Sequence, residues 1–394
     1  MPHKPNILIV DDEVAILDGL KRALRKQRDR WNLYYAVGGR EAQAKLAQLK
    51  IDVLVTDMRM PEFGGVDLLE HALSEYPDMV RLILSGQTDP DDVLRATLLA
   101  HRFVGKPVDP AQLVAVIDDI FFLREYVERC DLMAVAHAVH DLPIFPGDIK
   151  ALFNLNQNGQ VQGEDLLAFV LSDPLLSAKI LHVAQSTFLG VNRPLQSIAE
   201  AINVLGEECV LNLLGPTRLF KPYHNALERE FFVSLVKKSR ALSHLSYAIA
   251  QAEHHDEHFA QAVKLAGLFS RIGLILLANH DAGKWREAYA QRDVEAGVGA
   301  AVSAHFQLPH QCLAGYLLNL WGMDRLVIEA VVHRSQRLEN LAELSQIAQV
   351  ITLANVIIAT AASGEQPTIP SSWPFTQGFD DYQAYYQQQG MGHG

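Results

Sequence analysis

The sequence predicts two structural domains, a doubly wound α/β domain at the amino end and a larger, almost wholly helical domain after it. Over the first hundred or so residues, short apolar runs alternate with amphipathic stretches, which is typical of βα units and a parallel sheet. From Pro110 the apolar residues recur at helical spacing, and β-branched runs are missing up to about residue 362. The 394 residues suffice for two or three domains, each with its own core.

Five apolar runs of the first domain are candidate strands. They are NILIV (6–10), the weaker NLYYAV (32–37), DVLVT (52–56), VRLIL (80–84) and RFVGK (102–106). Helical patterns lie between them, such as EVAILDGLKRALRKQ (13–27) and GREAQAKLAQL (39–49). In an open sheet of this kind, a functional site is expected at the carboxyl ends of the strands.

The first domain is predicted to cover residues 1–122. No Pro or Gly occurs between 111 and 142, so its fifth helix is expected to continue as a helical linker over 123–140. The helical domain follows at 141–362. The tail, 363–394, is rich in Gln, Pro, Gly and Tyr, and we expect it to be ordered in part at most, with Trp373 and Phe375 as candidates for docking on the core.

Composition argues against several classes of protein. The net charge is -12, and residues 123–394 carry 19 basic and 27 acidic side chains, so direct DNA binding is not expected and no basic recognition helix stands out. The three cysteines include no CxxC pair, which suits a reducing cytosol. Without a signal-peptide pattern or an apolar run of membrane-spanning length, we predict a cytoplasmic protein that makes no membrane contact.

Charged and hydroxyl side chains follow four of the predicted strands. Asp11 and Asp12 follow the first strand and Asp57 the third, and these strands are neighbours in the order 2-1-3-4-5. Three carboxylates at one edge repel one another unless a cation lies between them, and hard oxygen ligands favour Mg²⁺. Ser85 ends the fourth strand and Lys106 the fifth. This combination suits phosphoryl transfer.

Helix capping is the simplest alternative interpretation of these acids. Asp11 and Asp12 do precede a helix, where carboxylates are favoured. Capping does not account for Asp57, Ser85 and Lys106 together, and the phosphoryl-transfer interpretation is therefore preferred.

The motifs ILIVDDE, TDMRMPEFGG, LILSG and FVGKP, at these spacings, resemble the receiver domain of two-component response regulators over about residues 4–122. The resemblance implies a flavodoxin-like doubly wound parallel sheet, in which Asp57 accepts a phosphoryl group from a sensor histidine kinase. It also implies that Asp12, Asp57 and the backbone carbonyl of Arg59 ligate Mg²⁺, with Asp11 contributing through water.

The same resemblance implies a switch around the phosphorylated group. Lys106 would pair with the acyl phosphate, Ser85 would hydrogen-bond to one of its oxygens, and Phe103 would be the aromatic side chain that rotates. Many receivers have Thr where this chain has Ser85, and the hydroxyl is kept.

The helical domain resembles an HDOD domain, an all-helical relative of the HD phosphohydrolases, over about residues 132–360. The motifs that carry the resemblance follow one another in the order LPIFP, SDPLLSAKIL, QSTFLG, SIAEAINVLG, LAGLFSRIGLILL, AHFQLPHQCLAGYLLNLWGM and IEAVVHRS. It implies an all-α fold for this part of the chain.

Within LFSRIG, Ser270 and Arg271 stand where catalytic HD domains carry adjacent His and Asp metal ligands. A hydroxyl is a poor ligand for a transition metal, and a guanidinium stays protonated and cannot ligate. We therefore expect no metal ion and no enzyme activity in this domain. Four histidines that remain nearby, His244, His305, His310 and His333, are interpreted as polar surface or core.

Together these features predict a phosphorylation-dependent response regulator. Its non-catalytic HDOD domain would act by binding an unidentified signalling protein or by rearranging a homodimer. Phosphorylation of Asp57 should draw Ser85 and Phe103 inward and reshape the face formed by the fourth helix, the fifth strand and the fifth helix. The fifth helix, continued toward residue 135, would carry this change to the HDOD domain as a rigid lever. One alternative stays open, a divergent metal-dependent phosphohydrolase, for example a cyclic-dinucleotide phosphodiesterase, whose ligands the sequence does not reveal.

Overall fold

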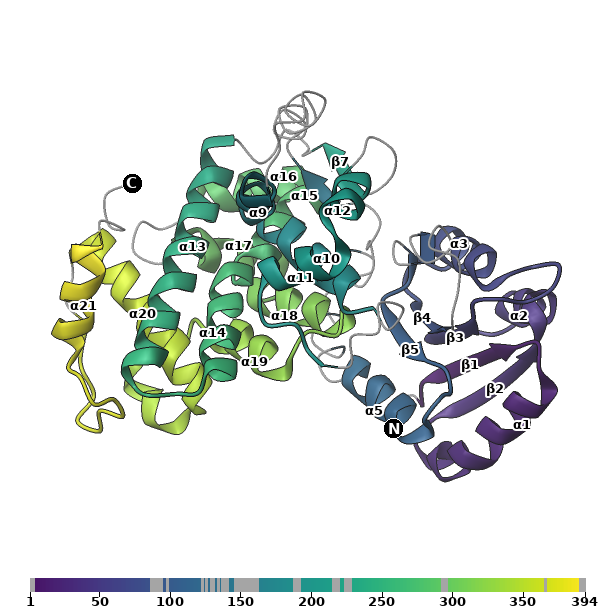
Figure 1. Ribbon diagram of the computed structural model, residues 1–394. Helices are drawn as coiled ribbons and strands as arrows, with labels where there is room; N and C mark the ends of the chain where they lie inside the picture. Colours follow the sequence, from purple (N-terminus) through teal and green to yellow (C-terminus); the bar gives the residue numbers. More distant parts are fainter. Residues whose placement is uncertain are drawn as a thin grey trace.

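The protein consists of a sheet flanked by helices and a larger body of helices beside it (Figure 1). This computed structural model describes residues 4–85, 95–96, 99–121, 124, 127, 132, 135, 142–144, 163–186, 193–214, 220–222, 229–291, 297–364 and 367–389. The predicted fold class, a doubly wound α/β domain followed by a helix-rich domain, is confirmed.

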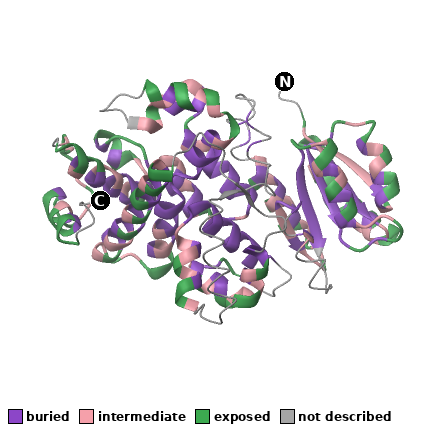
Figure 2. Cartoon of the chain, turned by 90° about the horizontal axis from the view of Figure 1, so that it is seen from above, coloured by how far each residue is buried: buried purple, intermediate pink, exposed green. Residues whose placement is uncertain are grey.

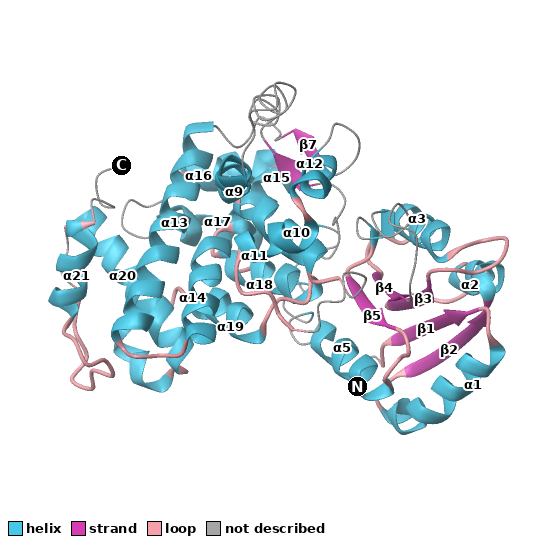
Figure 3. Cartoon of the chain, viewed as in Figure 1, coloured by secondary structure: helices cyan, strands magenta, loops and turns pink. Residues whose placement is uncertain are grey.

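Five parallel strands form the sheet in the predicted order β2-β1-β3-β4-β5. Figure 3 shows the helices packed around it. The elements of this domain are β1 (Asn6–Asp11), α1 (Val14–Ala23), η1 (Leu24–Asp29), β2 (Asn32–Val37), α2 (Gly38–Leu46), β3 (Val53–Asp57), α3 (Gly65–Glu75), β4 (Val80–Ser85), β5 (Arg102–Gly105) and α5 (Pro110–Phe121).

Successive residues of a strand point to opposite faces of the sheet, and in the central strands both sets are buried. These strands are therefore buried along their length in Figure 2. Ile7 and Ile9 of β1 belong to the cluster that includes α1 and α5, and Leu8 and Val10 to the one that includes α2 and α3. Burial on both faces explains why these strands are continuous apolar runs. The helix expected between β4 and β5 lies largely outside the described residues.

The second domain is built almost entirely of helices, together with one short parallel pair, β6–β7, that we did not predict. Its elements are β6 (Leu142–Ile144), α9 (Gly163–Leu171), α10 (Pro174–Ala184), α11 (Ile198–Leu205), α12 (Glu207–Leu214), β7 (Phe220–Pro222), α13 (Arg229–Ala252), α14 (Glu257–Phe269), α15 (Ile272–His280), α16 (Ala282–Ala290), α17 (Gly297–Phe306), α18 (His310–Leu320), α19 (Arg325–His333), η3 (Leu338–Glu343) and α20 (Gln346–Ser363).

The start of α10 is encoded in the segment SDP. The Asp173 carboxylate accepts hydrogen bonds from the backbone N–H groups of Leu175 and Leu176, at 2.9 and 3.2 Å, and Pro174 occupies the first helical turn. An acid at the cap and a proline directly after it are the strongest helix-start signals in a sequence. Every residue of α10 is buried, so the helix lies in the core of the second domain.

The tail contains more structure than we expected. Residues 367–389 are described, and α21 (Phe379–Gln388) packs against α20. The carboxylate of Glu253 anchors the segment by accepting hydrogen bonds from the backbone N–H of Thr376 at 2.9 Å and from the hydroxyl of Tyr382. Trp373 and Phe375 are partly buried against the core, in line with their predicted docking.

Among the described residues, two helical stretches are long and apolar enough to cross a membrane, although we expected no apolar run of that length. They are Glu257–His280, whose most apolar window is 89% buried inside the protein, and Gln346–Ser363, at 56%. The first is interrupted at Ser270 and Arg271, between α14 and α15. Both stretches supply core residues of the second domain, which accounts for their apolar composition.

The predicted helical linker, residues 123–140, falls mostly outside the described residues. Of this stretch only residues 124, 127, 132 and 135 are described. Arg124 donates to Asp52 of the first domain at 2.7 Å, and Val127 lies in the hydrophobic cluster that continues into the second domain. The continuity of the linker and the domain limits remain predictions.

Candidate functional site

The strand register brings the predicted site residues to one edge of the sheet. Asp57, the last residue of β3, pairs with Leu84 of β4, and Ser85 pairs with Gly105 of β5. Lys106 follows Gly105 directly. Each successive strand therefore ends next to its neighbour, and the sequence prediction of a shared edge is met by the topology. The side chain of Ser85 is outside the described part of the structure.

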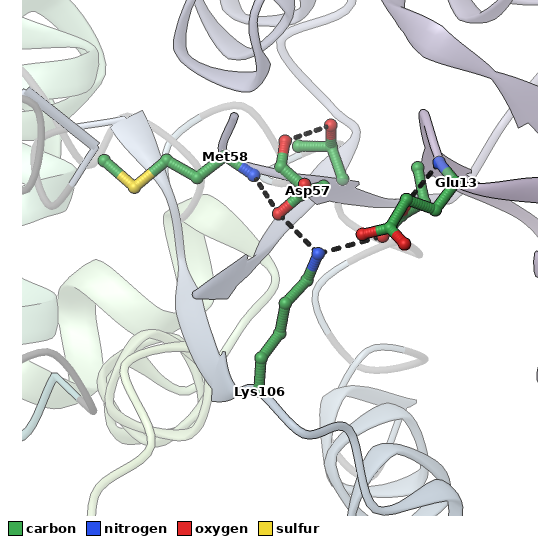
Figure 4. Close-up of polar contacts among 6 residues, drawn as sticks. Glu13, Asp57, Met58 and Lys106 are labelled. Atoms are coloured by element: carbon green, nitrogen blue, oxygen red, sulfur yellow. Dashed lines mark hydrogen bonds and ion pairs between the residues drawn. The ribbon is translucent and has the colours of Figure 1, made fainter. Parts of the chain in front are cut away.

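Lys106 bridges two of the three acids (Figure 4). Its Nζ lies 2.9 Å from Oδ1 of Asp57 and 3.0 Å from Oδ2 of Asp11. Asp11 is fully buried and Asp57 is 7% exposed. Asp12 completes the group, because one oxygen of each of the three carboxylates lies within 4.8 Å of the other two. The structure thus gathers the acids that the sequence placed on neighbouring strands.

The backbone around Asp57 fixes its carboxylate. Oδ1 accepts a hydrogen bond from the N–H of Met58 at 2.7 Å, which Figure 4 shows beside the Lys106 contact. Gly65, at the start of α3, approaches so closely that a Cβ there would lie 1.9 Å from the carbonyl oxygen of Asp57. The second glycine of the motif EFGG is therefore required sterically, since any side chain would displace the loop that carries Asp57.

The charges in the site perturb one another's protonation. Burial raises the pKa of Asp57 above its ordinary value, and the nearby Asp11 adds to this, while the hydrogen bond and charge of Lys106 act in the opposite direction. For Lys106, burial alone would lower the pKa, but its contacts with Asp57 and Asp11 outweigh burial and raise it. Lys106 is therefore a firmly charged ammonium in this site.

Three carboxylates with one ammonium leave an excess of negative charge, which fits a hard divalent cation such as Mg²⁺. Within the described residues, this is the only group of three or more potential metal ligands. Arg59, whose backbone carbonyl we predicted as a further ligand, comes two residues after Asp57 and has an exposed side chain. When bound, the ion would neutralise charge on the transferring phosphoryl group.

The strand that ends in Lys106 also contacts the helical domain. The ring of Phe103, on β5, lies 5.8 Å from the ring of His182 on α10, centroid to centroid. His182 in turn stacks at 5.6 Å on Trp321, whose backbone carbonyl lies 3.1 Å from its Nδ1. His182 is buried, and burial lowers its pKa well below the ordinary value, so the ring in this interface is neutral.

A second contact between the domains is polar. Nε of Arg102, the residue before Phe103, donates to the backbone carbonyl of Asn319 at 3.1 Å. The side-chain amide of Asn319, near the end of α18, donates to the carbonyl of Asp119 on α5. Sequence analysis missed Arg102, His182 and Asn319, because no local motif indicates which residues meet across a domain interface.

The Ser270–Arg271 pair occupies the break between α14 and α15. The Ser270 hydroxyl donates to the carbonyl of Gly267 at 2.7 Å and accepts from Nη1 of Arg271 at 3.1 Å. Ser270 is fully buried and Arg271 is 8% exposed. The two residues are thus part of the interior of the helical domain rather than a solvated turn.

Comparison with known families agrees with the geometry. Residues 7–118 match the family model "Response regulator receiver domain", and residues 142–337 match "HDOD domain". The chain joins a response-regulator receiver domain to an HDOD domain. The predicted recognition, a receiver domain followed by an HDOD domain, is confirmed.

Several curated relatives resemble part of the chain. The hydrogenase transcriptional regulatory protein HoxA of Cupriavidus necator is 30% identical over 133 residues, which are 33% of this chain and 26% of that protein. The response regulator GtcR of Aneurinibacillus migulanus is 32% identical over 111 residues, 28% of this chain and 45% of that protein. This chain therefore spans about a quarter to a half of the length of these relatives.

Solved structures are similar over part of the chain. The receiver domain of an HD domain-containing protein from Pseudomonas fluorescens covers 29% of this chain and 90% of its own, at 27% identity and a TM-score of 0.27. The MmoQ response regulator from Methylococcus capsulatus covers 58% of this chain and 90% of its own, at 24% identity and a TM-score of 0.46.

Proposed function

We propose that Asp57 accepts a phosphoryl group from a sensor histidine kinase and that this modification switches the HDOD domain. The observation that carries the proposal is the bridge of Lys106 between Asp57 and Asp11 at the carboxyl edge of the sheet. It holds a buried carboxylate beside a fixed positive charge, which is the arrangement that phosphoryl transfer requires.

The chemistry is an in-line displacement. A carboxylate oxygen of Asp57 forms a bond to phosphorus while the bond from phosphorus to the kinase histidine breaks, and the histidine ring leaves with that electron pair. The product is an acyl phosphate, whose added negative charge faces the Lys106 ammonium. Hydrolysis of the acyl phosphate returns the carboxylate and inorganic phosphate and resets the domain.

Transmission would run through β5. Ser85 precedes the segment that leads to β5, and Phe103 packs against His182 of the HDOD domain. Movement of Ser85 and Phe103 toward the acyl phosphate would take the Phe103 ring away from the His182 ring. Arg102 and Asn319 lie beside it and hold the domains together, so a change in β5 would alter how α10 and α18 pack on the receiver.

The HDOD domain is proposed to act without catalysis, by binding a signalling protein or by rearranging a dimer in the cytoplasm. Arg271 lines an internal cavity of this domain together with Arg334 and Lys238, and these cations would repel a divalent metal ion. This arrangement does not favour the alternative of a metal-dependent phosphohydrolase.

The proposal is tested with the full chain and beryllofluoride, a mimic of the phosphoryl group, in the presence of Mg²⁺. Hydrogen exchange of backbone amides should change in β5, α10 and α18, and solution scattering should show a change in the particle's dimensions. Asp57→Ala should show neither change, whereas the exposed Asp78→Ala should respond as the wild type does. Identical exchange and scattering in the wild type with and without the mimic would contradict the proposed switch.

A further inference from the structure

A cavity of about 580 Å³ lies between helices of the HDOD domain. Its walls come from α13, α15, α17, α18 and α20 and from the residues that follow α19. This volume is in the range of protein pockets that bind small organic molecules. Arg271, which sequence analysis marked as a lost metal-ligand position, is one of the residues that line it.

Cations without acidic partners characterise the cavity. Arg271 and Arg334 are 8% and 6% exposed, and Lys238 lies on the exposed turn of α13 that also borders the cavity. Throughout the described residues, none of the three forms an ion pair with a carboxylate, and no Asp or Glu lines the cavity. Burying uncompensated charge is costly, so a fold that keeps two such guanidiniums needs an explanation.

Residues that line the cavity also have buried hydrogen-bond donors without a partner among the described residues. Nη2 of Arg334 lies 2.8 Å from Nε2 of His310, and since a guanidinium only donates, Nε2 accepts and Nδ1 carries the ring proton. Neither that Nδ1 nor Nε of Arg334 has a hydrogen-bond partner in the described structure. Arg271 uses only Nη1, toward Ser270, and its remaining N–H groups have no partner among the described residues.

Burial and the positive charges around the cavity lower the pKa values of the basic side chains that line it. Burial lowers the pKa of Arg271 to about 10. Burial and then the charge of Arg271 lower the pKa of Arg334, and burial followed by both arginines lowers the pKa of His310 well below its ordinary value. An anion in the cavity would relieve each of these effects, because it would stabilise the charged forms.

We propose that this cavity binds a small organic phosphate. The guanidiniums of Arg271 and Arg334 would hold the phosphate dianion, and Lys238 would attract it at the rim. Two buried positive charges and a third at the entrance match a dianion better than the single charge of a carboxylate. The volume exceeds that of phosphate alone, and the apolar walls formed by Phe231 and Leu274 would cover the organic part. This site does not depend on the chemistry of the receiver.

The test uses the full chain with three probes: orthophosphate, phenyl phosphate and benzoate, each at constant ionic strength. The midpoint of thermal unfolding should rise and saturate with orthophosphate, and phenyl phosphate should act at lower concentration because its ring adds an apolar contact. Benzoate, which has the same ring and a single charge, should bind more weakly than phenyl phosphate. Equal effects of benzoate and phenyl phosphate would overturn the assignment to phosphates.

Variants connect the response to the cavity. Arg271→Met and Arg334→Met should each lose about tenfold or more in affinity for orthophosphate, since each removes charge-assisted hydrogen bonds. Arg337→Met, an exposed arginine three residues after Arg334, should respond as the wild type does. A wild type without a saturable response, or Met variants with wild-type affinity, would overturn the proposal.

A purely structural role for these arginines gives a different result. If each guanidinium served only to stabilise the fold, Arg271→Met would unfold at a lower temperature without phosphate. On our proposal this variant is at least as stable as the wild type in the absence of phosphate, because an uncompensated buried charge has been removed. Arg271→Lys keeps the charge and should still respond to phosphate, although more weakly. If the Arg271→Lys variant were instead unfolded, the structural role would be favoured.

Discussion

The receiver edge and the HDOD cavity both concentrate side chains of one charge in a buried place, but their signs are opposite. At the receiver edge the acids share an internal cation, because Lys106 contacts both Asp57 and Asp11. Among the described residues, no acid lines the cavity or forms an ion pair with Arg271 or Arg334. The first site is therefore partly compensated and suited to receive a cation and then a phosphoryl group, while the second would be compensated by the small anionic ligand that we propose.

The two sites also differ in the structural elements that build them. The receiver acids come from the ends of parallel strands, which the topology aligns at one edge. In the cavity, Arg271 lies between the C-terminus of α14 and the N-terminus of α15, His310 begins α18, and Arg334 directly follows α19. A cation is favoured by the helix dipole at the C-terminus of a helix and disfavoured at the N-terminus, so the dipoles of α14 and α15 act on Arg271 in opposite directions. The helix dipoles alone therefore do not account for Arg271.

The largest expected effect comes from breaking the receiver site. Asp57→Ala should abolish incorporation of a phosphoryl group from acetyl phosphate, because the nucleophilic oxygen is gone. The measurement is the mass of the intact protein after incubation with acetyl phosphate and Mg²⁺. Asp78→Ala, an exposed acid of the same domain, should be labelled as the wild type is. Label retained on Asp57→Ala would show that another residue is the acceptor.

A second change lowers the positive charge of the cavity. Ser270→His combined with Arg271→Asp installs the residue types found at these positions in catalytic HD domains and removes one cation. We expect the response to orthophosphate to fall about tenfold or more, since one guanidinium is lost and a carboxylate is placed beside Arg334. No metal-dependent hydrolysis of cyclic dinucleotides should appear, because Arg334 and Lys238 remain. Product formation that requires an added transition metal would show that the other ligands are present after all.

Sequence analysis predicted the receiver more completely than the HDOD cavity, for physical reasons. Asp57 and Lys106 lie at strand ends, and a parallel sheet brings such ends together whatever the surrounding residues are. The cavity is formed by helices distant in sequence, and the spacing of Arg271, His310 and Arg334 along the chain does not indicate that they meet. His310 was interpreted as surface or core, and it is buried; the sequence did not indicate that its Nε2 lies 2.8 Å from Nη2 of Arg334 in the cavity wall.

The interface between the domains also contains a buried cation, Lys179 on α10, which is 1% exposed and whose Nζ lies 5.4 Å from the centre of the Trp321 ring. Burial, and then the charge of Arg81, lowers the pKa of Lys179 from 10.5 to about 7. Between these pH values the unfolded chain binds a proton that the folded chain does not. The free energy of unfolding should therefore rise with pH in this window, by up to about 1.4 kcal/mol per pH unit.

Urea unfolding between pH 7 and about 8.5 measures this change in the free energy of unfolding. The range stops there because Arg81, whose pKa is lowered to about 9, adds a similar rise in stability at higher pH. The neighbouring His182 has its pKa far below this range and stays neutral. Lys179→Met should remove the rise, and the exposed Lys237→Met should keep it. A wild type whose stability is flat or falls with pH here would mean that Lys179 stays charged in the folded protein.

The smallest expected effect is a coupling between the two sites through α18. His310, in the cavity wall, begins this helix, and Asn319, whose side-chain amide donates to the carbonyl of Asp119 on α5 of the receiver, lies near its end. Because one rigid helix contacts both places, a change in how it packs on the receiver also changes the cavity wall. We expect beryllofluoride and Mg²⁺ to change the affinity of the full chain for orthophosphate by about fivefold, at the lower end of measured allosteric couplings.

Asn319→Ala should abolish that change while orthophosphate binding itself persists, and the exposed Asn340→Ala should leave it intact. Equal affinities for orthophosphate with and without beryllofluoride in the wild type would show that the receiver site and the cavity are not coupled. In that case orthophosphate must also have no effect on beryllofluoride binding, since coupling free energies are symmetric.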